Sequence, residues 1–170
     1  MAVVTDGMEG GASISRLITE TLLNSYNRQV SFEPGDFLYL TAEISEFALE
    51  NYIKQTGINV GSTLVTFIVE NSQMNYVSVG DSHIYLMRNN TLTLLNKEHS
   101  LGALFKEKAE RGEVAPMETY TNPKRNFLTA YIGMGSFQIV DRNTNPIILK
   151  GGTRFCFALM AFTMIWEMMR

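Results

Sequence analysis

Two aspartates stand at turns of the chain where a carboxylate can do chemistry. Asp6 follows a short β-branched run and precedes a glycine-rich helix start, whose backbone N–H groups favour an anion. Asp81 lies in a tight turn between expected strands, where an aspartate commonly accepts hydrogen bonds from backbone N–H groups. Carboxylates are also the ligands that hard divalent cations prefer, and such a cation needs several of them. For both residues a structural role and a metal-binding role therefore stay open.

The two histidines, His83 and His99, are further titratable candidates. Neither has a second histidine or a cysteine at the spacing typical of metal ligands. His83 is expected on a strand after the turn at Asp81, and His99 precedes a helix start at Ser100. We therefore expect neither a zinc site nor a catalytic role for the histidines, and we predict that His99 braces a loop.

A strand, a glycine loop and a helix are the elements expected around Asp6. Residues 2–4 form the strand, and Gly10-Gly11 opens the helix. Ser13 or Ser15 is a candidate N-cap, and Arg28 near the other end suits the helix dipole. The apolar positions that predict this helix are Ile14, Leu17, Ile18 and Leu22.

A second helix and two β-hairpins are expected next. The helix follows the break at Pro34-Gly35 and ends near Gly57, with apolar positions at Leu38, Ala42, Phe47, Leu49 and Ile53. The hairpins flank Asp81 and pair residues 63–69 with 75–79, and residues 84–87 with 92–95. The chain thus presents four antiparallel strands in sequence.

The remaining pattern predicts mixed structure and a layered fold. The expected elements are a helix over 101–110, a loop over 114–124, strands over 127–132 and 137–140, a hairpin of 147–149 with 154–159, and an apolar helix over 162–169. Helices followed by an antiparallel meander indicate an α+β fold, in which sheets pack face to face and helices cover the outside. We expect a single domain over residues 1–170.

Composition excludes several classes of function. The chain has 170 residues, of which 45% are hydrophobic and 18% charged, the balance of a globular protein. The net charge is −3 and no run of like charges builds a polyanion-binding stripe, so nucleic acid is not an expected partner. No basic region opens the sequence, and the apolar stretch Phe155–Trp166 is shorter than the roughly 18 to 20 residues of a membrane span. No membrane association is expected.

The single cysteine, Cys156, lies in an apolar run that reads as a buried strand. One cysteine cannot form an intrachain disulfide, which is typical of a reducing compartment. We therefore expect a cytoplasmic location.

Several short motifs, in one order along the chain, resemble those of a known enzyme family. They are Val4–Met8 ("ADGMGG" in the family), Gly61–Val65 ("GTTL"), Val79–His83 ("VGDSR"), Glu98–Leu101 ("DHSL"), Asn122–Thr129 ("HPxRNxLT") and Gly152–Phe155 ("GDRFLL"). Together they resemble the metal-dependent protein phosphatases, the protein phosphatase 2C-like or PPM family. The resemblance covers nearly the whole chain from Val3 onward.

The resemblance implies a fold, a reaction and a metal site. The fold would be two packed antiparallel β-sheets flanked by helices, a phosphatase 2C-like sandwich truncated at both ends. The reaction would be hydrolysis of phosphoserine or phosphothreonine by a water bound to Mn²⁺ or Mg²⁺. By the same resemblance Asp6 and the carbonyl of Gly7 would hold metal, and Asp81 would belong to an accessory metal site.

The chain departs from the family pattern at several metal ligands. Residues 156–162 correspond to "LLCSDGL", so that Met160 stands in place of the aspartate and Ala161 in place of the glycine. A thioether is a poor ligand for Mg²⁺ or Mn²⁺. The family's first acidic strand and its final "DN" aspartate have no counterpart in this sequence. Glu9, beside Asp6, is expected to be a solvated residue more than a substitute ligand.

We therefore expect a serine/threonine phosphatase-family domain with weak or no activity. The alternative is a pseudophosphatase, which keeps the fold as a phosphoprotein-binding or regulatory module. A phosphoprotein or a regulatory protein is then the expected partner; Lys124 and Arg125 are candidate contacts, although solvated loop charges are more typical. Open strand edges or the apolar C-terminal segment also favour a homodimer.

Overall fold

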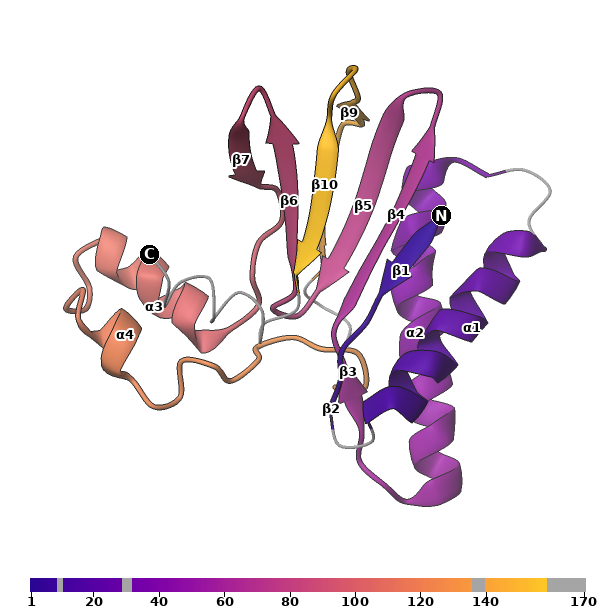
Figure 1. The fold of residues 1–170 in the computed structure, drawn as a ribbon. Coiled ribbons are helices and arrows are strands. Elements are labelled where there is room, and N and C mark those ends of the chain that lie inside the picture. Colours follow the sequence, from indigo (N-terminus) through magenta and orange to yellow (C-terminus); the bar gives the residue numbers. More distant parts are fainter. Residues whose placement is uncertain (9–10, 29–31, 136–139, 159–170) are drawn as a thin grey trace.

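The fold is taken from a computed structural model that describes residues 1–8, 11–28, 32–135 and 140–158 (Figure 1). The described strands are β1 (Ala2–Val4), β2 (Gly7–Met8), β3 (Gly61–Ser62), β4 (Leu64–Glu70), β5 (Gln73–Val79), β6 (His83–Arg88), β7 (Thr91–Leu94), β8 (Asp141–Arg142), β9 (Ile147–Ile148) and β10 (Arg154–Ala158). The described helices are α1 (Gly11–Asn27), α2 (Pro34–Thr56), α3 (Leu101–Glu110) and α4 (Glu118–Thr121).

The described strands form two main antiparallel sheets and one small one. The first sheet has the order β1-β4-β5-β8, and β9 also pairs with β5. The second sheet has the order β10-β6-β7, and β2 pairs with β3. Mixed helices and antiparallel sheets confirm the predicted α+β class.

The layers follow from which faces are apolar. Helices α1 and α2 lie on one side of the first sheet, the second sheet lies on its other side, and α3 with α4 projects away from both (Figure 1). The rings of Phe67 on β4 and Phe157 on β10 stack at 4.5 Å between centroids, which joins the two sheets. A second buried cluster, Val65, Met74, Tyr76 and Ile84, fills the same interface.

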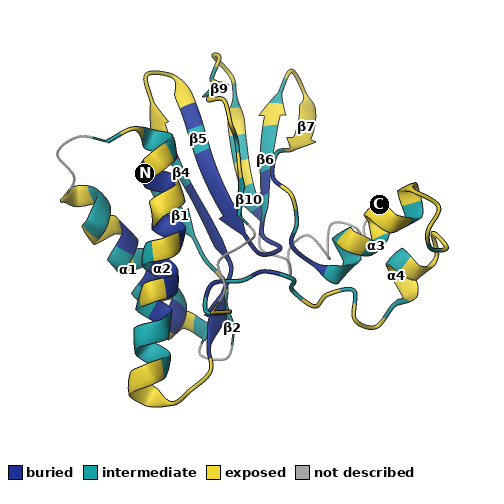
Figure 2. Ribbon diagram, turned by 180° about the vertical axis from the view of Figure 1, so that it is seen from behind, coloured by how far each residue is buried: buried dark blue, intermediate teal, exposed yellow. Residues whose placement is uncertain are grey.

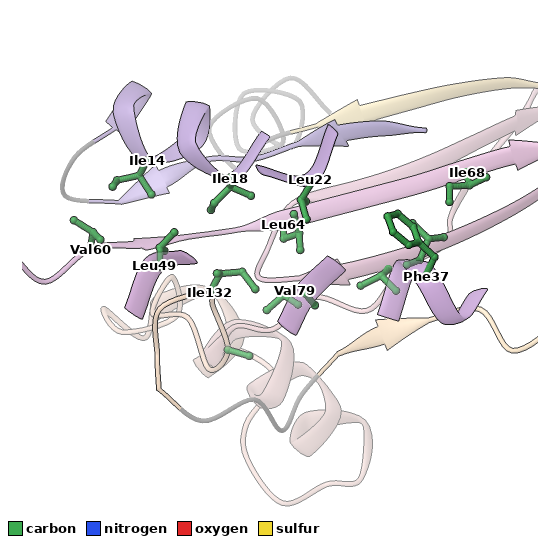
Figure 3. Packing of buried hydrophobic residues seen from close by; sticks show 14 residues of the cluster. Ile14, Ile18, Leu22, Phe37, Leu49, Val60, Leu64, Ile68, Val79 and Ile132 are labelled. Carbon is green, nitrogen blue, oxygen red and sulfur yellow. The ribbon is translucent and has the colours of Figure 1, made fainter. Parts of the chain in front are cut away.

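The main core lies between the two helices and the first sheet. Ile14, Ile18 and Leu22 recur at helical spacing on α1 and are fully buried against residues of α2 and β4 (Figure 3). Burying each such side chain contributes about 1.5–3 kcal/mol relative to leaving it in water. The periodicity in the sequence therefore predicted this helix and its buried face correctly.

Two-residue turns fix both hairpins. Asn71 and Ser72 have φ values of 49° and 58°, and Asn89 and Asn90 have 51° and 59°. Positive φ at both central residues matches the right-handed twist of paired strands, and asparagine tolerates it. The predicted hairpins are confirmed, but the four strands do not form one meander, because the chain crosses between the sheets after Val79.

Some local predictions at the helices need correction. Ser13 and Ser15 lie inside α1, because the helix already begins at Gly11, so neither is its N-cap. Phe47 is 66% exposed and does not belong to the buried face of α2. Gly57 does end α2, with φ 70° and its N–H donating to the Ile53 carbonyl, as predicted.

The later strands also differ from the prediction. The expected hairpin of residues 147–149 and 154–159 is wrong, because β9 pairs with β5 while β10 pairs with β6. Residues 127–132 form only two isolated bridges, at Leu128 and Ile132. The helix α3 is confirmed, and the loop over 114–124 contains the short helix α4.

Cys156 lies on a strand as predicted but is exposed and not buried. Side chains alternate along β10, and Phe155 and Phe157 take the inward positions. The strand expected at 137–140 and the helix expected at 162–169 fall largely or wholly outside the described residues. Within the described ranges, no helix has the length and apolar character that crossing a membrane requires.

Candidate metal centre

The loop that carries Asp6 is held at its backbone, and the residue itself is exposed. The Asp6 N–H donates to Thr63 Oγ1 at 3.1 Å. Its carbonyl accepts hydrogen bonds from the Thr63 N–H and the Ser62 hydroxyl, both at 3.0 Å. Asp6 is thus an exposed residue on a fixed backbone.

Gly7 follows at a position where only glycine fits. It pairs with Ser62 in the β2–β3 ladder. A Cβ at this position would collide with the carbonyl oxygen of Gly11 and would come within 3.1 Å of the Ser15 hydroxyl. The close approach of α1 to this loop therefore requires the glycine that the motif supplies.

The turn that carries Asp81 packs against the same residue that fixes Asp6. Gly80 has a φ of 105°, and a Cβ there would lie 2.8 Å from Thr63 Cγ2. Thr63 Oγ1 also shares a hydrogen bond of 2.9 Å with the Ser82 hydroxyl. Thr63, 3% exposed, therefore links the two aspartate loops. Sequence reasoning did not identify it, since only the three-dimensional fold brings these loops together.

Asp81 is a buried carboxylate whose pKa is raised to about 6. Burial is the main cause, because it disfavours the charged form. The negative charges of Glu98 and Asp6 raise the pKa further, and His83 acts in the opposite direction. Asp6 and Asp81, predicted to bind metal, thus lie within electrostatic range of one another.

His83 and Glu98 form a side-chain pair beside this turn. His83 Nε2 lies 3.2 Å from Glu98 Oε2, and His83 Nδ1 lies 3.1 Å from the Tyr85 hydroxyl. The Ser100 hydroxyl also donates to Glu98. Burial raises the pKa of Glu98, but the hydrogen bonds from His83 and Ser100 outweigh it and the pKa is lowered. Glu98 is therefore already engaged within the protein.

Buried polar contacts fix the segment between β7 and α3. Asn96 accepts from the Ile84 N–H at 2.7 Å and donates to the Ser78 hydroxyl and the Ser82 carbonyl, each at 2.8 Å. His99 accepts from the Gly80 N–H at 3.0 Å, so the prediction that it braces a loop is confirmed. Burial lowers the pKa of His99. These contacts make the turn at Asp81 rigid.

The described residues do not complete a two-cation centre. Among them, no group of three or more His, Cys, Asp or Glu side chains is placed to hold a metal ion. Two hard cations close together repel one another and need several carboxylates, whereas Asp6 and Asp81 supply two. Glu9 and Met160 lie outside the described residues.

A hollow of about 580 Å³ adjoins the Asp6 loop. Its lining includes Met8, Gly61, Phe127 and Tyr131. At its rim the Gly133 N–H donates to Glu46 Oε2 of α2 at 2.6 Å, and the Gly135 N–H donates to Glu46 Oε1 at 2.7 Å. Met8, Gly61 and Phe127 belong to motifs found in the sequence, but the sequence did not predict that these motifs line one hollow, nor did it single out Glu46.

The two candidate phosphoprotein contacts lie on the loop after α4. Lys124 is exposed and Arg125 is half-buried. The Arg125 carbonyl accepts from the Gly102 N–H at 2.7 Å, which ties the loop to the start of α3. Their cationic groups are thus presented on a fixed backbone.

Comparison with known proteins supports one family. Residues 3–109 match the family described as Protein phosphatase 2C. The chain is 29% identical over 155 residues to the serine/threonine phosphatase stp of Listeria welshimeri, covering 86% of this chain and 60% of the relative. It is 32% identical over 93 residues to the protein phosphatase PhpP of Streptococcus pneumoniae, covering 55% of this chain and 36% of the relative. The chain thus spans about 60% of the Listeria relative's length.

Solved structures show the same fold. The serine/threonine phosphatase PstP/Ppp of Mycobacterium tuberculosis superposes with a TM-score of 0.75 at 19% identity, over 91% of this chain and 66% of that one. A structure of the catalytic domain of PstP in complex with two manganese ions gives 0.68 at 19% identity, over 90% and 64%. The phosphatase MsPP of Mycobacterium smegmatis gives 0.72 at 23% identity, over 90% and 64%.

Proposed function

Since the chain belongs to the protein phosphatase 2C family, we propose that it is a serine/threonine phosphatase-type domain whose metal site is too incomplete for more than weak phosphomonoester hydrolysis. One observation carries the proposal. Asp6 and Asp81 are brought together through Thr63, as a metal site of the family would need, yet the described residues add no third carboxylate at ligand spacing. Two carboxylates and the Gly7 carbonyl suit one loosely held cation better than two tightly held ones.

Calorimetry with Mn²⁺ tests the binding part of this proposal. We expect one weak site, with a dissociation constant on the order of 10⁻⁴ M or weaker, the range of cation sites with few charged ligands. Asp6→Asn and Asp81→Asn should each weaken binding at least tenfold. Asp36→Asn removes an exposed carboxylate on α2 and serves as the matched control. Binding unaffected by either site variant would contradict the assignment.

Turnover of p-nitrophenyl phosphate and of a phosphothreonine peptide tests the reaction. We expect a rate that is low at saturating Mn²⁺ and falls further in Asp81→Asn. A turnover number of about 10 s⁻¹, typical of an enzyme, would contradict the proposal. It would show that ligands outside the described residues complete the metal centre.

Met160 favours the second candidate function, a pseudophosphatase that binds phosphoproteins or regulatory proteins. By the resemblance to the family's "LLCSDGL" motif, Met160 stands where the family has an aspartate. A methionine there supplies a thioether where Mg²⁺ or Mn²⁺ needs an oxygen ligand.

Restoring the ligand separates the two functions. The double variant Met160→Asp, Ala161→Gly should raise Mn²⁺ affinity at least tenfold if a missing carboxylate is the main defect. The added Asp81→Asn should abolish the gain. If affinity does not rise, the divergence from an active phosphatase extends beyond one ligand.

Binding of a phosphothreonine peptide without turnover would support the binding-module function. Lys124→Ala and Arg125→Ala should then weaken that binding.

A further inference from the structure

The hollow beside the Asp6 loop is neutral and rich in apolar side chains. Among the described residues that line it, none carries a charged side chain. Its larger side chains are those of Met8, Asn59, Asn126, Phe127, Leu128 and Tyr131. Pockets that bind small organic groups have volumes of about 300–1,000 Å³ and combine apolar and aromatic walls with a few polar groups. With about 580 Å³, the hollow has the size and character to accept an uncharged, apolar group.

Met8 and Tyr131 meet over the backbone of Gly61 in this hollow. A Cβ at Gly61 would lie 2.6 Å from Met8 Cε and 2.7 Å from Tyr131 Cδ2, so both side chains lie directly against the glycine. A methionine is flexible and adapts its shape to an apolar neighbour. Since Met8 follows Gly7 in the chain, the apolar lining of the hollow continues directly from the candidate metal loop.

Backbone hydrogen bonds hold the segments that form the hollow. Next to Gly61, Ser62 and Ile132 exchange two hydrogen bonds, of 3.0 and 2.8 Å. The Phe127 carbonyl accepts a hydrogen bond from the Leu101 N–H at 2.9 Å, and Figure 1 shows this segment running from α4 back to β3. The hollow is therefore already formed without a ligand, which reduces the ordering that binding requires.

Phe127 is an aromatic side chain that the fold leaves largely uncovered. It is 59% exposed, and Figure 2 shows a mixture of exposed and intermediate residues along the chain after α4. An exposed aromatic ring beside a hollow offers apolar area for a partner to cover. Phe127 also lies two residues after Arg125, a candidate contact for a phosphoprotein. One short segment thus presents both a cationic group and an aromatic ring.

A peptide that brings a phosphate to Asp6 can also reach the hollow. Met8 is two residues from Asp6, so their Cα atoms are at most about 7 Å apart. An extended peptide advances about 3.3 Å per residue. A side chain two or three residues from the phosphorylated residue therefore spans the distance from the Asp6 loop to the hollow.

On the basis of the phosphatase-type function above, we propose that the hollow binds an uncharged apolar side chain, preferably an aromatic one, that flanks the phosphorylated residue of a peptide. Phe127 and Tyr131 supply aromatic contacts to it, and Met8 adapts to its shape. A charged side chain is disfavoured, because the described lining offers it no opposite charge.

A free small molecule is the competing occupant, and the exposure of the lining argues against it. Pockets for small molecules bury about 70–90% of the ligand surface. Here Asn59, Asn126 and Phe127 are exposed, so the hollow encloses a ligand incompletely. A side chain that belongs to a peptide does not need such enclosure, because the phosphate holds it near the hollow at a high effective concentration.

Phosphothreonine peptides test the proposal with the full chain and saturating Mn²⁺. Each peptide carries phenylalanine at one position from −3 to +3 and alanine at the others, and binding is followed by fluorescence anisotropy. We expect one position at which phenylalanine binds at least about tenfold more tightly than alanine, the size of effect that apolar pockets produce. Aspartate or lysine at that position should bind no better than alanine.

Variants at exposed positions show whether the hollow causes this preference. Phe127→Ala removes a wall and Asn59→Trp fills part of the hollow, and each should reduce the ratio of phenylalanine to alanine affinity at least about threefold. Asp6→Asn should weaken both peptides and keep the ratio. Tyr120→Ala removes an aromatic ring of α4 that is 74% exposed and outside the lining, and should also keep the ratio. Circular dichroism establishes that each variant is folded.

The amide resonances of Gly61 and Gly133 report on the hollow without any phosphate or metal. An unphosphorylated phenylalanine peptide at millimolar concentration should shift both resonances in an NMR spectrum, and the alanine peptide should not. If these shifts occur but no phosphopeptide binds, the proposed phosphatase-type function fails and the hollow still takes an apolar side chain.

Three results would overturn the inference itself. Equal affinity for phenylalanine and alanine phosphopeptides, without shifts at Gly61 and Gly133, would show that the hollow binds no side chain. A preference that survives both Phe127→Ala and Asn59→Trp would place the specificity elsewhere. N-acetyl-phenylalanine amide that binds as tightly as the phenylalanine phosphopeptide would assign the hollow to a free small molecule.

Discussion

His99 and Gly80 exchange two hydrogen bonds. The Gly80 N–H donates to His99 Nδ1 at 3.0 Å, and the His99 N–H donates to the Gly80 carbonyl at 2.9 Å. Because Nδ1 accepts a hydrogen bond, the neutral ring carries its proton on Nε2. The pair joins the turn of Asp81 to the segment that starts α3.

Replacing His99 tests this pair. His99→Ala leaves the buried Gly80 N–H without an acceptor, and we expect a loss of about 1–3 kcal/mol in the free energy of unfolding at pH 7.5. Burial lowers the pKa of His99, so the unfolded chain takes up a proton that the folded chain resists. The stability that the neutral His99 ring contributes to the fold is fully present above the unfolded pKa, near 6.5, and declines as the pH falls below it.

Urea unfolding at pH 7.5 and 5.5 measures this difference. The variant should lose less stability on acidification than the parent protein. His99→Asn offers an uncharged acceptor in place of the ring. Its free energy of unfolding should depend on pH as little as that of His99→Ala. If acidification affects the parent and both variants alike, the ring is not the titrating group.

Asp81 should give a pH dependence of opposite sign. Its pKa is raised to about 6, so the protonated form favours the fold. That stability is present below about pH 4 and is lost as the pH rises through 6. Asp81→Asn cannot ionise, so we expect it to exceed the parent by about 1–3 kcal/mol at pH 7.5 and to match it at pH 4. Metal-free unfolding curves, with Asp36→Asn as a surface control, check this.

Substitutions at two glycines distinguish the cost of an unfavourable backbone conformation from the cost of a steric clash. Gly80 and Gly112 have φ values of 105° and 74°, but only at Gly80 would a Cβ meet another residue, namely Thr63. Gly112→Ala should cost about 1 kcal/mol for conformation alone. Gly80→Ala should cost at least about 2 kcal/mol more and should weaken Mn²⁺ binding, because it displaces the turn of Asp81. Equal losses in chemical denaturation would contradict the packing argument.

Glu46 should stabilise the loop over residues 133–135. Its two carboxylate oxygens accept hydrogen bonds from the N–H groups of Gly133 and Gly135, and it is 7% exposed. Hydrogen bonds to a charged group are worth about 1.5–3 kcal/mol, so Glu46→Ala should lose about 2–4 kcal/mol. Glu50→Ala is the control, because it removes only a partly exposed ion pair with Lys54 within α2. Its free energy of unfolding should fall by less than about 0.5 kcal/mol.

Hydrogen exchange separates this loss from a general defect of α2. In Glu46→Ala the amides of Gly133 and Gly135 should exchange faster while those of α2 stay protected. Uniform loss of protection would contradict a local role for Glu46.

Local patterns in the sequence predicted the local structure. Ile14, Ile18 and Leu22 predicted the buried face of α1 because helical side chains three or four apart share one face. The asparagine turn at Asn89-Asn90 predicted a hairpin because it supplies positive φ.

The remaining features depend on contacts between distant segments. The strands around Asp81 belong to different sheets, which no local signal distinguishes. Thr63 links two loops, and Glu46 contacts residues far away in the sequence. Cys156 was expected inside because its neighbours are apolar, but alternation along β10 places it outside. Such features follow from topology, which a single sequence does not specify.

The placement of β1 beside β4 also sets the order in which the protein can fold. Ala2 pairs with Phe67, so this pairing closes a long loop that contains both α1 and α2. The β4–β5 hairpin needs only a two-residue turn and can form within microseconds. Pairings of high sequence separation slow folding toward milliseconds to seconds, so the edge of β4 stays open while the helices assemble. During synthesis and refolding, this edge is where two unfinished chains would pair and aggregate.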